Sequence, residues 1–332
     1  TIKEIAELAG VSVATVSRVF SDAEAVSERT RKHVLAVAEK YHYEPNLLGR
    51  NLRTKETKVI LIILTTIANH FCSRVVRGIN AAAQKAGYTA MICATNDLRE
   101  SEEAYLDLVR NHMADGAIII NTLMSEKEVQ KMSEYYHIVQ CSEYIDYDRT
   151  PYVSIDNRLA AFEAVEHLIS LGRKRILYLT VENQLLSTKQ RFLGYQEALG
   201  QHGIPFNSEL ICYGNYGYRN GSEIVAEALR QGKQFDAVFA ISDRMASGAV
   251  TALKNAGLYV PEDVAVIGFD NTDISYIIEP QLTTIAQPQQ QMGEIAFELL
   301  IEKMKNNTVS HRILKHQLVV RQSTNISIHG RD

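Results

Sequence analysis

The sequence TIKEIAELAGVSVATVSRVF, residues 1–20, predicts two short helices joined by a tight turn. Thr1 is placed to cap the first helix, and Glu4 follows three residues later, as in a capping box. Gly10 ends this helix, because glycine adopts the left-handed conformation after a helix at low cost. Ser12 is placed to cap the second helix. The pattern indicates a helix-turn-helix whose second helix has side chains small enough to enter a DNA major groove.

An ordinary αα-hairpin without a DNA-binding role is the alternative interpretation of this stretch. Two observations favour DNA binding: Arg18 lies on the second helix, and a basic segment follows it. Residues 1–58 contain ten Lys and Arg against eight Asp and Glu, a charge of +2. The whole chain carries −4, so the remainder carries −6. Contacts between these basic groups and phosphates would make binding strongly dependent on salt.

The composition of the 332 residues is that of a globular protein with two or three domains and a sizeable core. No run approaches about 18 apolar residues, and the early Glu4 and Glu7 are atypical of a signal peptide. The four cysteines are scattered, without a CxxC spacing or a nearby His cluster. They predict buried, reduced thiols in a cytoplasmic protein that has no metal site and no cofactor.

A third helix is expected to begin at the cap Ser27 and to end near Tyr41. The following segment NLLGRNLR, residues 46–53, predicts a short helix with Asn46 as its cap. A helix of fewer than about 12 residues is marginal on its own, and Gly49 adds a penalty of about 1 kcal/mol. A plain linker is the alternative, but exposed leucines would be unusual in one, and the arginines of this segment suggest DNA.

From residue 58 onward, apolar runs alternate with amphipathic helical patterns. Residues 59–64, VILIIL, are a continuous apolar run, which is typical of a strand buried on both faces. The expected strands are residues 59–64, 88–94, 116–120, 138–141, 176–180, 210–213, 237–241, 264–269, 284–287 and 312–321, with a crossover through residues 152–155. This alternation predicts two doubly wound parallel sheets in series, with a ligand cleft at the carboxyl ends of their strands.

A helix-turn-helix, a short Leu/Arg helix and two α/β lobes, in this order, resemble the LacI/GalR family of bacterial transcription regulators. The resemblance covers nearly the whole chain. The segments that carry it are TIKEIAELAGVSVATVSRVF, VSERTRKHVLAVAEKYHYEPN, GRNLR, RGINAAAQKAGY, DGAIII, VSIDN, GYQEAL, SDRMASGAV, VPEDVAVIGFDNTD and VRQST. VSIDN with AAFEAV, and GFDNTD followed by LTTIAQP, resemble the cytidine-repressor branch of the family.

The resemblance implies an α/β fold with a helix-turn-helix head and a two-lobed, periplasmic-binding-protein-like core. Residues 1–45 would be the DNA-binding domain, residues 46–57 a hinge helix and linker, and residues 58–332 the effector-binding core. The N-lobe would contain residues 58–156 and 288–316, and the C-lobe residues 157–287 and 317–329.

The DNA contacts implied by the resemblance fall into three groups. The positions that match the major-groove readers are Val13, Ala14, Thr15, Ser17 and Arg18, and those that match phosphate contacts are Thr1, Ser27 and Tyr43. In the hinge helix, the matching positions are Asn46, Arg50 and Leu52. Here a leucine wedges into a minor-groove step and kinks the DNA. The family usually has Ala where this chain has Gly49, which weakens the hinge helix.

The effector positions implied by the resemblance are Asn69, Phe71, Arg191, Tyr216, Ser242, Asp270 and Gln287. Asn69 and Phe71 belong to NHFC, where the family often writes NPFF. An arginine fork, a carboxylate, amides and aromatic rings together suit a polyhydroxylated ligand, so a sugar or nucleoside is expected. Asp243 is expected to act mainly as the N-cap of the next helix.

Other functions remain as alternatives. The sequence has no P-loop, HExxH, GxSxG or GxGxxG, which disfavours an enzyme. A solute-binding receptor would share the two lobes but not the basic head. A family member controlled by a phosphorylated protein corepressor stays open, although AFE at residues 296–298 lacks an arginine pair. The preferred interpretation is a homodimeric repressor of double-stranded operator DNA, controlled by a small molecule and not associated with a membrane.

Overall fold

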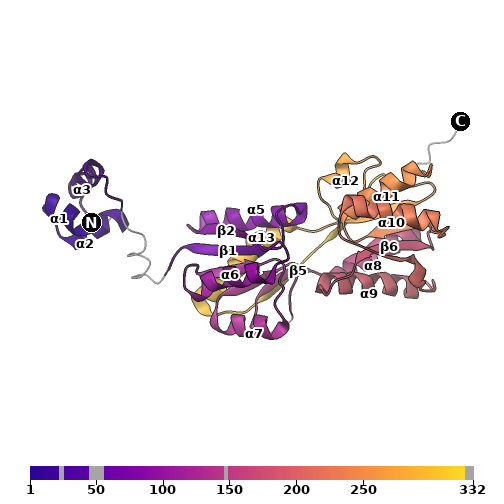
Figure 1. The fold of residues 1–332 in the computed structure, drawn as a ribbon, viewed down its shortest axis with the longest axis horizontal. Helices are drawn as coiled ribbons and strands as arrows, with labels where there is room; N and C mark the ends of the chain where they lie inside the picture. Colours follow the sequence, from indigo (N-terminus) through magenta and orange to yellow (C-terminus); the bar gives the residue numbers. More distant parts are fainter. Residues whose placement is uncertain (22–25, 45–55, 146–148, 326–332) are drawn as a thin grey trace. The chain divides into compact units, whose positions relative to one another are not determined.

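The computed structural model describes residues 1–21, 26–44, 56–145 and 149–325 (Figure 1). They divide into two compact units, Thr1–Thr57 and Lys58–Asp332. Each unit has hydrophobic clusters of its own. Within the described ranges, no helix is long and apolar enough to cross a membrane.

Three helices form the first unit: α1 (Ile2–Leu8), α2 (Val13–Ser21) and α3 (Glu28–Lys40). The capping box of Thr1 and Glu4 is confirmed, and Gly10 has a φ of +63°, as its place after the helix requires. Ser12 Oγ accepts a hydrogen bond from the Thr15 backbone N–H at 3.1 Å, so it caps α2 as predicted. The small core that joins the helices consists of Ile5, Ala6, Ala9, Val16, Val19 and Val34.

The second unit contains two six-stranded sheets, and the prediction of two doubly wound α/β lobes is confirmed. The strands of the N-lobe sheet are β1 (Val59–Leu64), β2 (Thr89–Ala94), β3 (Gly116–Ile119), β4 (Ile138–Cys141), β5 (Tyr152–Ile155) and β11 (His311–Leu314). They are parallel, in the order β11-β5-β4-β3-β1-β2. The helices are α5 (His70–Lys85), α6 (Arg99–Arg110), α7 (Glu126–Tyr135) and α13 (Gln289–Asn306). Ile60 and Ile62 of β1 pack in the cluster that contains α5 and α13, whereas Leu61 and Ile63 pack with α6 and α7.

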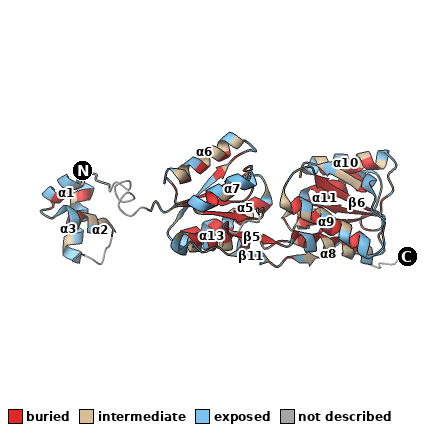
Figure 2. Ribbon diagram, turned by 90° about the horizontal axis from the view of Figure 1, so that it is seen from below, coloured by how far each residue is buried: buried red, intermediate tan, exposed pale blue. Residues whose placement is uncertain are grey.

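The C-lobe sheet has the order β12-β10-β9-β8-β6-β7, and only its pairing of β10 with β12 is antiparallel among the described strands. Its strands are β6 (Ile176–Val181), β7 (Ile211–Gly214), β8 (Ala237–Ala240), β9 (Ala265–Asp270), β10 (Thr283–Ala286) and β12 (Gln317–Val319). Its helices are α8 (Asn157–Ser170), α9 (Leu186–Gln201), the short 3₁₀ helix η1 (Ser208–Leu210), α10 (Tyr218–Arg230), α11 (Asp243–Asn255) and α12 (Ile274–Ile277). Figure 2 shows buried strands between helices whose outer sides are exposed.

Helices α5 and α13 cross at two glycines that face each other. A Cβ atom on Gly78 would lie 2.0 Å from a carbonyl oxygen of α13, and one on Gly293 would lie 2.1 Å from a carbonyl oxygen of α5. Both distances are far below van der Waals contact, so the two backbones touch directly. This crossing fixes the position of α5, whose first turn carries Phe71.

The chain passes between the lobes three times: at residue 156, at residues 287–288 and at residues 315–316. Two predictions for this region are wrong. Residues 152–155, expected to be a crossover, are the buried strand β5. Residues 312–321, expected to be one strand, contribute β11 to one sheet and β12 to the other. Their extended pattern continues across the boundary, and it does not show where the pairing partner changes.

Candidate DNA-binding surface and effector cleft

Helix α2 presents a polar and small-sided surface to solvent. Val13, Ala14 and Arg18 are exposed, and Thr15 and Ser17 are partly exposed. On the opposite side, Val16 and Val19 are 0% and 5% exposed and anchor the helix in the core of the head. The five predicted base-reading positions therefore share the outer side of one anchored helix, as major-groove reading requires.

The three residues that are predicted to contact phosphates also cap helices or pack in the head. Thr1 caps α1, and Ser27 Oγ caps α3 by accepting the Thr30 backbone N–H at 3.3 Å. The ring of Tyr43 packs edge-on against Phe20, with 5.9 Å between ring centroids, and burial raises the Tyr43 pKa. The three predicted hinge residues, Asn46, Arg50 and Leu52, lie outside the described residues.

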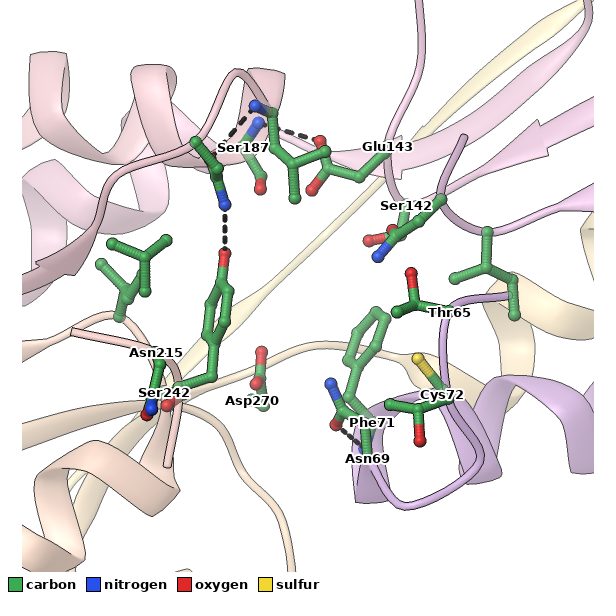
Figure 3. Close-up of a pocket in the computed structure, with 18 of the residues that line it drawn as sticks. Thr65, Asn69, Phe71, Cys72, Ser142, Glu143, Ser187, Asn215, Ser242 and Asp270 are labelled. Atoms are coloured by element: carbon green, nitrogen blue, oxygen red, sulfur yellow. Dashed lines mark hydrogen bonds between the residues drawn. The ribbon is translucent and has the colours of Figure 1, made fainter. Parts of the chain in front are cut away.

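A cleft of about 990 Å³ lies between the N-lobe and the C-lobe (Figure 3). Thr65, Ser142 and Glu143 line it from the N-lobe, and Ser187 and Asn215 line it from the C-lobe. All seven predicted effector positions line this one cleft: Asn69, Phe71, Arg191, Tyr216, Ser242, Asp270 and Gln287. Since they come from both lobes, a ligand that touched them all would bridge the lobes.

Arg191 is held in the wall of the cleft by three partners. Its Nε donates to Asn157 Oδ1 at 2.9 Å, and its Nη1 donates to the Ile241 carbonyl at 2.8 Å. The guanidinium carbon lies 3.6 Å from the centroid of the Phe269 ring, a cation–π contact. The residue is 7% exposed. These contacts orient the guanidinium before any ligand arrives, which reduces the entropic cost of binding.

Asp270 ends strand β9 at the floor of the cleft. Its φ of +99° is unusual for a residue with a side chain, and such strain is often found at functional sites. Gln287 Nε2 donates to its Oδ1 at 2.7 Å, and Gln289 Nε2 donates to its backbone carbonyl. Burial raises the Asp270 pKa, and the charge of Arg191 and the bond from Gln287 oppose this rise. The carboxyl group is thus positioned to accept hydrogen bonds from ligand hydroxyls.

The prediction that Asp243 is the N-cap of α11 is wrong. Ser242, not Asp243, is the N-cap, and its Oγ accepts the Met245 backbone N–H at 3.3 Å. Asp243 is 1% exposed and accepts hydrogen bonds from the backbone N–H of Thr272 at 2.6 Å and from the Thr284 hydroxyl at 2.5 Å. Burial, with the neighbouring charge of Asp270, raises the Asp243 pKa to about 7. Asp243 thereby ties the loop after Asp270 to α11 and β10.

The aromatic groups of the cleft come from opposite lobes. In the N-lobe, Asn69 caps α5 through the Phe71 backbone N–H at 3.0 Å, and this places the Phe71 ring in the cleft. In the C-lobe, Asn183 Nδ2 donates to the Tyr216 hydroxyl oxygen at 3.1 Å, and the Tyr216 and Thr188 hydroxyl groups share a hydrogen bond of 3.3 Å. Cys72 lies beside Phe71, and burial, together with the charge of Asp270, raises its pKa to about 12. This thiol is therefore protonated at neutral pH.

The sequence analysis did not identify Glu143, which lines the cleft, or Asn157, which supports Arg191 in the wall of the cleft. Glu143 follows β4 and accepts a hydrogen bond from the Ser187 backbone N–H at 3.1 Å, across the two lobes. Asn157, at the first crossover, holds Arg191. VSIDN marks the position of Asn157 but not its partner, and no local pattern singles out Glu143. Among the described residues, no group of three or more His, Cys, Asp or Glu could hold a metal ion.

A helix-turn-helix unit followed by a two-lobed ligand-binding core defines a DNA-binding regulator with a separate effector domain. Residues 1–46 match the family of bacterial regulatory proteins, lacI family, and residues 57–323 match periplasmic binding proteins and the sugar binding domain of the LacI family. This chain therefore belongs to the LacI family of bacterial transcription regulators.

Individual relatives align over almost the full length. The chain is 34% identical over 327 residues to the HTH-type transcriptional repressor CytR of Escherichia coli strain K12, which covers 98% of this chain and 96% of CytR. The crystal structure of the lac repressor dimer bound to operator and the anti-inducer ONPF superposes with a TM-score of 0.87 at 26% identity and covers 98% of each chain. The transcriptional regulator CelR–cellobiose complex gives a TM-score of 0.75 at 28% identity, with 97% of this chain and 99% of CelR covered.

Proposed function

We propose that this protein is a cytoplasmic, non-enzymatic repressor that binds operator DNA as a homodimer and responds to a small sugar or nucleoside. The observation that carries the proposal is the cleft in which Arg191, Asp270 and Gln287 are already oriented by their partners. Phe71 and Tyr216 add an aromatic ring from each lobe. Cellobiose, in the CelR complex, is a ligand of this polyhydroxylated class.

The proposed roles belong to three successive parts of the chain. Residues 1–45 bind DNA, residues 46–57 form the hinge, and the two lobes bind the effector. In a dimer, two heads read the half-sites of a pseudo-palindromic operator, and Leu52 wedges into the minor groove between them. Effector binding moves the lobes and changes whether the hinge helices can pair, with a coupling free energy of about 1–3 kcal/mol.

The exposed apolar surface of the edge strand β2 is an argument for the proposed dimer. Met91 and Ile92 on this strand are 47% and 53% exposed, an apolar edge that a monomer would leave open to aggregation. The lac repressor in the similar structure is a dimer. We expect Ile92→Asp to shift the protein from dimer to monomer in light scattering, and an unchanged mass would contradict this placement of the interface.

Two measurements test the proposed function. Operator DNA selected from a random library should bind the full chain and should lose binding when residues 1–57 are deleted; retained affinity would refute the role of the head. A thermal-shift screen with sugars and nucleosides should identify a ligand, and Arg191→Ala should abolish its stabilising effect. A ligand that binds Arg191→Ala as well as the wild type does not use this cleft as proposed.

A further inference from the structure

Glu143 joins the two lobes at the start of helix α9. It lies in the N-lobe after β4, and its Oε2 accepts the backbone N–H of Ser187, the second residue of α9, at 3.1 Å (Figure 3). Helix α9 has no side-chain cap of its own, because the N-cap position is Leu185. The carboxylate of one lobe therefore acts as the N-cap of a helix in the other lobe.

The first turn of a helix attracts anions, since its free N–H groups and the helix dipole both favour negative charge. In a ligand cleft, this is the natural place for a phosphate or carboxylate of the ligand. In α9 the place is taken by Glu143. Two other helices that begin at the cleft, α5 and α11, are capped by Asn69 and Ser242 from their own sequence.

The ionisable side chains around the cleft are mostly carboxyl groups. Among the described residues that line it, five are carboxylates and two are arginines: Asp97, Glu143, Glu182, Asp243 and Asp270 against Arg191 and Arg244. The Arg191 guanidinium is already engaged by Asn157 and the Ile241 carbonyl. Burial raises the pKa of Tyr216 in the opposite lobe, and the charge of Glu143 adds to the rise.

We infer that Glu143 is a specificity-determining residue, which makes the cleft select an unphosphorylated, neutral sugar or nucleoside and reject the phosphorylated form. A ligand phosphate at the start of α9 would have to displace the Glu143 carboxylate, in a cleft whose lining also includes Asp270. A neutral hydroxyl can instead donate to Glu143 or Asp270 without this repulsion. The inference deepens the proposed function, because it concerns the effector of the same cleft.

The decisive probe is inorganic phosphate, which requires no knowledge of the natural effector. Full-length wild type, Glu143→Ala and Glu143→Gln are titrated with phosphate and, as a reference, with chloride at equal ionic strength. We expect Glu143→Ala to gain phosphate affinity by about tenfold, because the N-terminus of α9 becomes free. Glu143→Gln keeps an oxygen that can cap α9 and removes only the charge, so its gain should be smaller. Since the DNA-binding head is the same in all variants, the differences report on the cleft.

Glu182→Gln is the matched control. It removes one negative charge from the lining but leaves Glu143 on α9, so its phosphate affinity should stay near that of the wild type. The inference is overturned if Glu143→Ala gains no phosphate affinity, or if Glu182→Gln gains as much. It is also overturned if the wild type already binds phosphate tightly.

A second arm compares ribose and the four ribonucleosides with their 5-phosphates and 5′-monophosphates on the wild type. The neutral member of any pair that binds should bind at least about tenfold more tightly. A phosphorylated member that binds as well as its neutral partner contradicts the inference. If no neutral compound binds, the proposed effector class is weakened, but the phosphate titration still decides the role of Glu143.

Discussion

Gly78→Ala tests whether the backbone contact between α5 and α13 holds the N-lobe side of the cleft. The added methyl group would lie 2.0 Å from the Gln290 carbonyl oxygen and 3.1 Å from the Glu294 backbone nitrogen. Carbon and oxygen atoms need more than about 3 Å, so the helices must separate by about 1 Å. Gly293 makes the reciprocal contact with α5, and the two helices therefore cannot slide past each other to relieve the clash.

The magnitude follows from two opposing effects. Overpacking a close helix contact costs about 1–3 kcal/mol, and this contact lies at the upper end because a backbone atom, not a flexible side chain, is struck. Replacing a helical glycine by alanine returns up to about 1 kcal/mol. We therefore expect the free energy of unfolding to fall by about 2 kcal/mol. The effector should also bind more weakly, since α5 carries Asn69 and Phe71 into the cleft.

Urea unfolding measures this loss, provided that the m-value is unchanged. The matched control is Gly200→Ala on α9, where the new methyl group would meet no atom within 4 Å and only the helix-propensity gain remains. Gly200→Ala should therefore stabilise the protein slightly. The direct backbone contact would be refuted if Gly78→Ala lowered the unfolding free energy by less than about 0.5 kcal/mol. It would also be refuted if Gly78→Ala and Gly200→Ala had the same unfolding free energy.

The other predictions concern pH, the head and DNA. The Asp243 pKa of about 7 in the folded protein exceeds its ordinary value of 3.8, so its protonated form contributes stability that is full below about pH 3.8 and is lost as the pH rises through about 7. Asp243→Asn should flatten the dependence of urea stability on pH between these values, and an unchanged slope would contradict the raised pKa. Ser27→Ala should destabilise the head by about 1 kcal/mol through the lost cap of α3, seen as a lower melting temperature of the head by calorimetry; an equal melting temperature would rule out this cap energy. Arg18→Ala should weaken operator binding and reduce its salt dependence, and an unchanged affinity would remove Arg18 from the interface.

Local patterns predicted most of the fold. The apolar run at residues 59–64 predicted the strand β1, which is buried from Ile60 to Leu64, and the Thr1 and Glu4 pair predicted the capping box. Both signals depend only on neighbouring residues. Helix α9 begins at Leu186 without a side-chain cap from its own sequence. The group that caps this helix is Glu143, 44 residues earlier in the chain, so no nearby residue could mark its start.

The sequence predicted seven residues that line the cleft, but it did not predict the contacts that hold them in place. The resemblance supplied all seven positions, whereas Asn157 behind Arg191 and Gln289 behind Asp270 emerge only when segments far apart in sequence are packed together. The choice between Ser242 and Asp243 as helix cap shows the same limit. Both side chains can cap a helix. Asp243 does not cap α11, because its carboxylate is buried and accepts hydrogen bonds from Thr272 and Thr284.

The hydrophobic clusters of the two units have no member in common among the described residues. The head is held by small side chains from α1, α2 and α3, and every buried member of the larger clusters lies at or beyond Ile60. A substitution in the core of one unit therefore replaces no buried core residue of the other unit. After gene duplication, a lineage can change the DNA sequence it recognises and the metabolite it senses at separate times, and a recombination event near residue 57 can exchange one property without rebuilding the other.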